Sequence, residues 1–95
     1  MTYSYAAEKP RLFEEDNQKM FLSVRDRVHR LITQSGAVTL EKAIEKETGS
    51  SWTMIACVDR LLELGEIIEL RYPEGTFAWS QWRVFTRPIH ADGQP

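Results

Sequence analysis

The sequence of 95 residues contains one cysteine, Cys57, and this scarcity limits the chemistry open to the protein. A single thiol cannot form an internal disulfide, so we expect a protein of a reducing compartment, the cytoplasm. No pair of cysteine or histidine residues has the spacing of a zinc site, because His29 and His90 lie far apart. The sequence therefore predicts no bound metal.

Long apolar segments are also missing. No run approaches the roughly 20 consecutive apolar residues that a membrane-spanning helix needs. The first residues, MTYSYAAEKPRLFEED, lack the basic and then apolar layout of a signal peptide. We therefore expect a soluble protein without a membrane partner.

The signatures of enzymes are sparse. No glycine-rich loop follows a predicted strand, so the usual phosphate-binding loops are missing. Cys57 lies close to an apolar row of a predicted helix, where a buried thiol is usually inert. The acidic run EED at residues 14–16 is typical of a helix start. We expect no cofactor and no enzymatic activity.

Positive charge is in short supply as well. The chain has 12 lysine and arginine residues against 14 aspartate and glutamate residues, a formal net charge of -2. Affinity for nucleic acid comes largely from neutralised phosphates, so this balance is unfavourable for a nucleic-acid binder. A local basic patch can still outweigh the total.

The residues that are present fit one folded domain, since 42% are hydrophobic and 27% are charged. Residues 1–12 lack helical periodicity and contain Pro10, which predicts an N-terminal arm. Residues 13–87 form the predicted domain. Residues 88–95 carry two prolines and a glycine, which predicts a flexible C-terminal tail.

Three helices are predicted in the first two thirds of the chain. Residues 13–35 place apolar side chains on one face at helical spacing, and Gly36 offers a left-handed stop. Thr39 is the predicted N-cap of a short second helix. A third helix over residues 52–64 begins after Ser50 or Ser51. Gly65 follows it because the chain must turn sharply there into a strand.

Residues 66–86 predict a β-hairpin. The segment YPEG at residues 72–75 has proline at the second and glycine at the fourth position of a type I turn. Alternation predicts that Phe77, Trp79 and Phe85 share one face. The other face is predicted to carry Ala78, Trp82 and Val84. Since both faces are apolar, we expect cover from the N-terminal arm or from a second copy, and we predict a homodimer.

The segment VTLEKAIEKETGSSWTMIACVDRLLELGEIIEL resembles a winged helix-turn-helix domain. The resemblance rests on the spacing of Met54, Val58, Leu61, Gly65 and Ile67, and it covers about residues 18–86. It implies an α+β fold, in which a three-helix bundle with a helix-turn-helix is followed by a two-stranded β-hairpin wing. It also implies a small transcriptional regulator that binds double-stranded DNA, with the third helix in the major groove and the wing on the flanking backbone.

Carried onto this chain, the resemblance implies DNA contacts from the start and outer face of the third helix, from the second helix and from the wing. The implied contacts are Lys42, Ser50, Ser51, Trp52, Thr53, Ala56, Arg60 and Arg71. Lys46 and Arg83 are further candidates for contacts to the DNA backbone. Hydroxyl groups at a helix N-terminus can hold a phosphate, and arginine can read guanine.

The charges of the same segment favour a different class of partner. Between Gly36 and Leu64 three basic residues stand against five acidic ones. The outer face of the third helix is predicted to present Trp52, Ile55 and Ala56, and exposed apolar residues often mark a protein interface. The alternative prediction is therefore a winged-helix adaptor that binds another protein through this face and the aromatic hairpin.

Some of these residues also have ordinary structural interpretations. Trp52 could fold over the start of its helix, and Arg60 could pair with Asp59 or Glu63. Positive charge gathers instead in the segment RDRVHR, residues 25–30, on the first helix. This cluster could be an anion site or the charged outer face of a helix.

Overall fold

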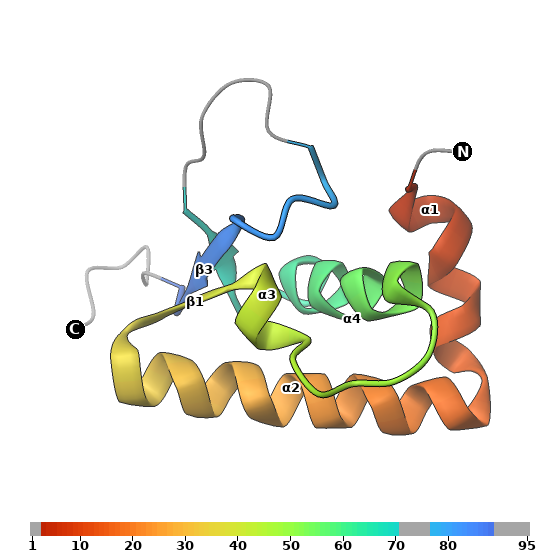
Figure 1. Ribbon diagram of the computed structural model, residues 1–95, viewed down its shortest axis with the longest axis horizontal. Helices are drawn as coiled ribbons and strands as arrows, with labels where there is room; N and C mark the ends of the chain where they lie inside the picture. The colour runs from red at the N-terminus through yellow and green to blue at the C-terminus, as the bar shows by residue number, and fades with distance from the viewer. Residues whose placement is uncertain (1–2, 71–76, 89–95) are drawn as a thin grey trace.

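A computed structural model describes residues 3–70 and 77–88 of the chain (Figure 1). Over these residues the fold is α+β, with four α-helices, one 3-10 helix and a three-stranded antiparallel sheet. The helices are α1 (Tyr5–Glu8), η1 (Lys9–Phe13), α2 (Glu15–Ser35), α3 (Leu40–Ala43) and α4 (Ser51–Glu63). The strands are β1 (Ala37–Thr39), β2 (Ile68–Glu69) and β3 (Val84–Thr86).

The long helix α2 forms the base of the molecule in Figure 1. Its inner face carries Val24, Val28 and Ile32, which are buried at helical spacing. The helix ends at Gly36, whose φ of 85° is left-handed, as the sequence predicts. It begins at Glu15 rather than Phe13, because Phe13 belongs to the preceding 3-10 helix.

The two helices that follow begin at the predicted caps. The hydroxyl of Thr39 accepts a hydrogen bond from the amide of Lys42 at 3.2 Å, and α3 is only four residues long. Ser50 caps α4 by accepting from the amide of Thr53 at 3.5 Å. After α4 the chain turns at Gly65, which has a φ of 76°. Both N-caps and the glycine turn are thus confirmed.

The sheet has the order β1–β3–β2, and it contains a strand that the sequence did not predict. Val38 of β1 lies opposite Phe85 of β3, and Glu69 of β2 lies opposite Phe85 on the other side. Strand β1 has three residues, too few to produce a readable alternation. Val38 and Phe85 are buried, so the sheet closes one end of the helical core.

The predicted hairpin is correct in its paired strands and wrong in its aromatic segment. Residues 77–83 form turns, in which the amide of Ser80 bonds to the carbonyl of Phe77 at 2.9 Å. Trp79 and Phe77 are therefore not on a strand, and neither shares a strand face with Phe85. The predicted turn at residues 72–75 lies outside the described residues.

The N-terminal residues are also different from the prediction. The segment read as an arm folds into α1 and η1, and Tyr3 and Leu12 are buried in the core. Ser4 caps α1 by accepting from Ala7, and Pro10 lies at the start of η1, where its missing N–H is not needed. We refer to residues 3–13 as the N-terminal segment.

Helix α4 is enclosed by its neighbours. It packs on α2 with Val58 and Leu61, both fully buried. Its opposite face, by helical spacing, carries Trp52, Ala56 and Asp59, and the N-terminal segment lies against it. No helix in the described ranges is long and apolar enough to cross a membrane.

Candidate functional site

The face of α4 that is turned away from α2 is occupied by the chain itself. The phenol of Tyr3 donates a hydrogen bond to Oδ2 of Asp59 at 2.5 Å. The Tyr3 ring also meets Trp52 edge to face, with ring centroids 6.3 Å apart and an interplanar angle of 74°. Burial and the bond to Asp59 raise the pKa of Tyr3, so it remains a neutral donor.

A second set of contacts continues along this face to Glu63. Tyr5 donates to Oε1 of Glu63 at 2.7 Å, and Nζ of Lys9 lies 3.0 Å from Oε2. Hydrogen bonds from Tyr5, Lys9 and Arg60 lower the pKa of Glu63 to about 2. Burial and the bond to Glu63 raise the pKa of Tyr5 to about 12. Glu63 is therefore ionised and Tyr5 is neutral at neutral pH.

A buried arginine joins this face to the sheet. Arg83 is 4% exposed, and its guanidinium lies 2.8 Å from both Asp59 and Glu69. Its Nη1 donates to the carbonyl of Ala78 at 2.6 Å. Although burial opposes the charged form, the two carboxylates raise the pKa of Arg83. Arg83 is thus a structural residue, and the prediction that it contacts a DNA backbone is wrong.

Several residues predicted on the outer face of α4 are buried. Ala56 is fully buried, Thr53 is 3% exposed and Ile55 is 5% exposed. In this conformation Ala56 offers no side-chain surface to a partner, and Thr53 and Ile55 offer only a narrow edge. Their predicted place on an exposed surface is therefore wrong. The reason is the N-terminal segment and the aromatic turns, which cover a helix that the sequence left half open.

The predicted cationic contacts are engaged within the chain. Arg60 pairs with Glu63 at 2.7 Å, as the structural interpretation predicted, and its guanidinium lies 5.6 Å from the centroid of the Phe13 ring. Lys42 pairs with Glu45 at 3.2 Å. These pairs reduce the positive charge that either residue offers to a phosphate.

The remaining predicted contacts lie around the start of α4. Ser50 is the N-cap, Ser51 is exposed and Trp52 is half-buried. Lys46 is exposed and has a left-handed backbone, with a φ of 73°. Arg71 lies outside the described residues. Ser50 and Thr53 line a polar hollow of about 530 Å³, in which Arg11 and Lys19 stand beside the acidic residues Asp16 and Glu47.

The basic cluster on α2 is used for internal ion pairs. Glu66 accepts from Arg25 at 2.7 Å and lies 2.8 Å from His29. Arg27 pairs with Glu47 at 2.8 Å. Although burial works in the opposite direction, the bonds from Arg25 and His29 lower the pKa of Glu66. The cluster therefore ties α2 to the connection between α3 and α4 and to the turn after α4.

Two apolar hollows flank α4, and we name the first the aromatic recess. It lies between α3, α4 and the turns at residues 77–82, and it has a volume of about 270 Å³. Its lining consists of Leu40, Glu41, Ile44, Ser51, Trp52, Ile55, Trp79 and Gln81. No lysine or arginine of the described residues is part of this lining, and Glu41 is its only charged residue.

Exposed aromatic rings lie in the turns at residues 77–82. Phe77 stacks on Trp79, with centroids 4.6 Å apart and an interplanar angle of 2°. Trp79 is 42% exposed and Trp82 is 68% exposed. The polypeptide holds the turns in place, because the amide of Leu40 donates to the carbonyl of Arg83 at 2.7 Å. Sequence reasoning expected an aromatic surface at these residues, but it placed them on a strand instead of in turns.

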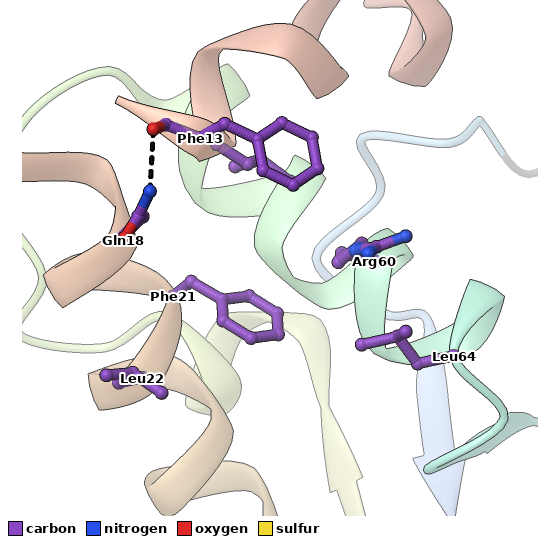
Figure 2. A pocket seen from close by; sticks show the side chains of 7 residues that line it. Phe13, Gln18, Phe21, Leu22, Arg60 and Leu64 are labelled. Atoms are coloured by element: carbon purple, nitrogen blue, oxygen red, sulfur yellow. Dashed lines mark hydrogen bonds between the residues drawn. The ribbon is translucent and has the colours of Figure 1, made fainter. Parts of the chain in front are cut away.

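We name the second hollow the Phe13 groove (Figure 2). It has a volume of about 350 Å³ and lies between η1, α2 and α4. Its lining consists of Leu12, Phe13, Gln18, Phe21, Leu22, Arg60 and Leu64. Sequence reasoning missed this groove, because Phe13 was assigned to α2. The aromatic and aliphatic residues at positions 12, 13, 21 and 22 were its available signal.

The described residues contain little reactive chemistry. Cys57 is buried, and burial raises the pKa of its thiol to about 12. Among residues 3–70 and 77–88, no three acidic, histidine or cysteine side chains gather in a way that could hold a metal ion. Comparisons with protein-family models, curated proteins and solved structures found no match for this chain.

Proposed function

We propose that this chain is a protein-interaction module of winged-helix type, whose aromatic recess binds a partner segment that is both apolar and basic. The order of α2, α3 and α4, followed by the paired strands β2 and β3, supports the winged-helix assignment. The observation that carries the function is the lining of the recess. Half-exposed tryptophan rings stand there beside a single carboxylate.

The chemistry of the recess defines its partner. Trp52, Ile55 and Trp79 offer apolar surface, which favours a large aliphatic or aromatic side chain. Glu41 offers a negative charge at the edge, and the Phe77–Trp79 stack offers a ring face for a cation. A lysine or arginine next to an apolar residue satisfies both requirements. Tryptophan is also enriched among the residues that dominate binding energy at protein interfaces.

Duplex DNA, the partner implied by the resemblance, has less support. The outer face of α4 carries Asp59 and Glu63, and the N-terminal segment covers it. A reading helix must enter the major groove with its outer face free. Most lysines and arginines of the described residues also pair with carboxylates of the same chain. We place the interaction in the cytoplasm, where the single thiol of Cys57 stays reduced.

Selection from a library of random peptides, each about 12 residues long, tests the proposed partner chemistry. We expect enriched peptides to place lysine or arginine beside tryptophan, phenylalanine, leucine or isoleucine. Trp79→Ala should weaken their binding at least about tenfold, the effect of losing about 1.4 kcal/mol. Trp82→Ala is the matched control, because Trp82 is more exposed but does not line the recess. Its effect should stay below about threefold.

A second pair of variants tests the role of the negative charge in the recess. Glu41→Gln should weaken peptides with a basic residue, whereas Glu45→Gln should not, because Glu45 pairs with Lys42 outside the recess. Random duplexes are titrated in parallel at about 50 mM salt. Tight duplex binding that falls steeply with salt would establish the DNA function instead. Equal losses in Trp79→Ala and Trp82→Ala would overturn the assignment of the recess.

A further inference from the structure

We propose that the polar hollow beside Ser50 and Thr53 binds a small molecule that carries a phosphate monoester. Its volume of about 530 Å³ falls among the pockets that hold small molecules, roughly 300–1,000 Å³. The aromatic recess and the Phe13 groove are apolar, whereas basic, acidic and hydroxyl side chains line this hollow. The site does not depend on the partner proposed for the aromatic recess.

Three elements meet at the hollow. Arg11 belongs to η1, Lys19 to the first turns of α2, and Thr53 to the first turn of α4. Figure 1 shows the starts of α2 and α4 at the same end of the molecule, beside η1. These elements pack on one another, so the side chains that line the hollow are held on a folded frame.

The hydroxyl of Thr53 is the observation that points to a ligand. Thr53 is 3% exposed and its amide bonds to Ser50, but its hydroxyl has no hydrogen-bond partner within residues 3–70 and 77–88. Every side-chain nitrogen or oxygen that is sealed from solvent in those ranges does have a partner. The Thr53 oxygen therefore reaches the hollow that its side chain lines. A bound oxyanion would give this almost buried hydroxyl the partner that such groups usually have.

The positive charges around the hollow favour an oxyanion. Lys19 has no ion pair within the described part of the chain, and Arg11 only approaches Glu8, at 3.8 Å. Ser50 places the N-terminus of the 13-residue helix α4 at the hollow, and the helix dipole adds positive potential there. Hydroxyl, ammonium and guanidinium donors on different sides suit the three terminal oxygens of a phosphate monoester.

The two carboxylates define the rest of the ligand. Glu47 pairs with Arg27 at 2.8 Å and accepts a hydrogen bond from Ser23, so its charge is already compensated. Asp16 has no such partner among the described residues and can accept from a hydroxyl or an amine. A nucleic-acid strand would bring several phosphates towards these acids, whereas a small molecule brings one. The ligand is therefore a single phosphate monoester with a hydroxyl or amine close to it.

Two matched probes, ethyl phosphate and phosphoethanolamine, test the site on the full chain at pH 7 and constant ionic strength. Both should shift the backbone amides of Gly49, Ser50 and Thr53 saturably, with dissociation constants on the order of 1 mM. Phosphoethanolamine should bind about threefold tighter, because its amine can reach Asp16. In Asp16→Asn this difference should disappear.

Substitutions separate the site from general attraction of anions. Thr53→Val keeps the shape of the side chain and removes the hydroxyl, so it should weaken ethyl phosphate about tenfold, whereas Thr53→Ser should not. Lys19→Gln should weaken it about threefold or more, and its exposed position keeps the fold intact. Lys46→Gln is the matched control, because Lys46 is exposed but does not line the hollow.

Shifts that stay linear with both probes up to about 50 mM would overturn the proposal. Equal losses in Lys19→Gln and Lys46→Gln would overturn it as well, and so would unchanged binding in Thr53→Val. Equal affinity for the two probes in the wild type would contradict the role of Asp16. A random duplex that displaces ethyl phosphate from these amides would assign the hollow to DNA instead of a small molecule.

Discussion

At the scale of single residues, Arg83 connects several elements of the fold. It holds Asp59 of α4, Glu69 of β2 and the carbonyl of Ala78 while being almost fully buried. Sequence reasoning placed it on the surface, since an arginine in a predicted wing has no pattern that reveals its partners. Its two carboxylate partners, Glu69 and Asp59, are 14 and 24 positions away in the sequence.

Removal of this guanidinium should therefore lower the free energy of unfolding strongly. Arg83→Met leaves two largely buried carboxylates without a cation, and such a loss costs about 3–5 kcal/mol of the free energy of unfolding. Urea denaturation followed by circular dichroism measures the change. Arg60→Met is the control, because Arg60 pairs with Glu63 on the surface, where an ion pair contributes little, and its effect should be much smaller. Equal losses in the two variants would contradict the role of Arg83.

The stability of the fold should depend on pH through Glu63. Its pKa falls from 4.5 to about 2 on folding, so the native state binds fewer protons than the unfolded state in that window. The stability from this residue is complete above pH 4.5 and is lost as the pH falls towards 2. Glu63→Gln should flatten that part of the stability profile, which thermal unfolding at pH 7, 4 and 2.5 measures. An unchanged slope in the variant would contradict the assigned contacts.

At the scale of elements, the N-terminal segment decides how much of α4 is exposed. Tyr3, Tyr5 and Lys9 bind the face of α4 that the winged-helix resemblance leaves open. Tyr3 is 7% exposed, so the segment is part of the core and not a loose arm. What looks like a reading helix in the sequence is consequently an enclosed helix.

Detachment of this segment should be visible locally. Tyr3→Ala removes a buried ring and the donor to Asp59, so we expect the amides of α4 near Asp59 to exchange with solvent at least about tenfold faster. Hydrogen–deuterium exchange measured peptide by peptide tests this. Tyr3→Phe keeps the ring and should have a smaller effect. Unchanged exchange in Tyr3→Ala would show that the segment does not protect α4.

The features that could be predicted from the sequence are those that depend only on residues close together in the chain. The caps at Thr39 and Ser50 and the left-handed turns at Gly36 and Gly65 depend only on neighbouring residues, and all four are confirmed. Strand β1 was missed because three residues carry no period. The aromatic turns at residues 77–83 were misread because a run of aromatic residues favours a strand when the tertiary contacts are unknown.

The candidate site was harder to predict than the fold, for a related reason. The sequence identified Trp52 and the aromatic residues of the wing as a potential interface, and Trp52 and Trp79 do line the aromatic recess. It also placed Ala56 and Ile55 on the surface, where they are buried. Helical periodicity shows which face of α4 meets α2, but it cannot show that a distant segment covers the other face.

At the scale of the whole molecule, two apolar hollows lie on different flanks of α4. The aromatic recess involves the first half of the helix, with Trp52 and Ile55, and the Phe13 groove involves the second half, with Arg60 and Leu64.

The most direct test of this arrangement is a map of backbone amide chemical shifts during titration with a peptide enriched by the wild-type chain, and separately with a random duplex at about 50 mM salt. We expect the peptide to shift amides that surround the recess, near Leu40, Trp52 and Trp79. The duplex should leave them unchanged. Shifts caused by the duplex around Ser50, Ser51 and Lys46, without any response of the recess to the peptide, would contradict a protein-binding function.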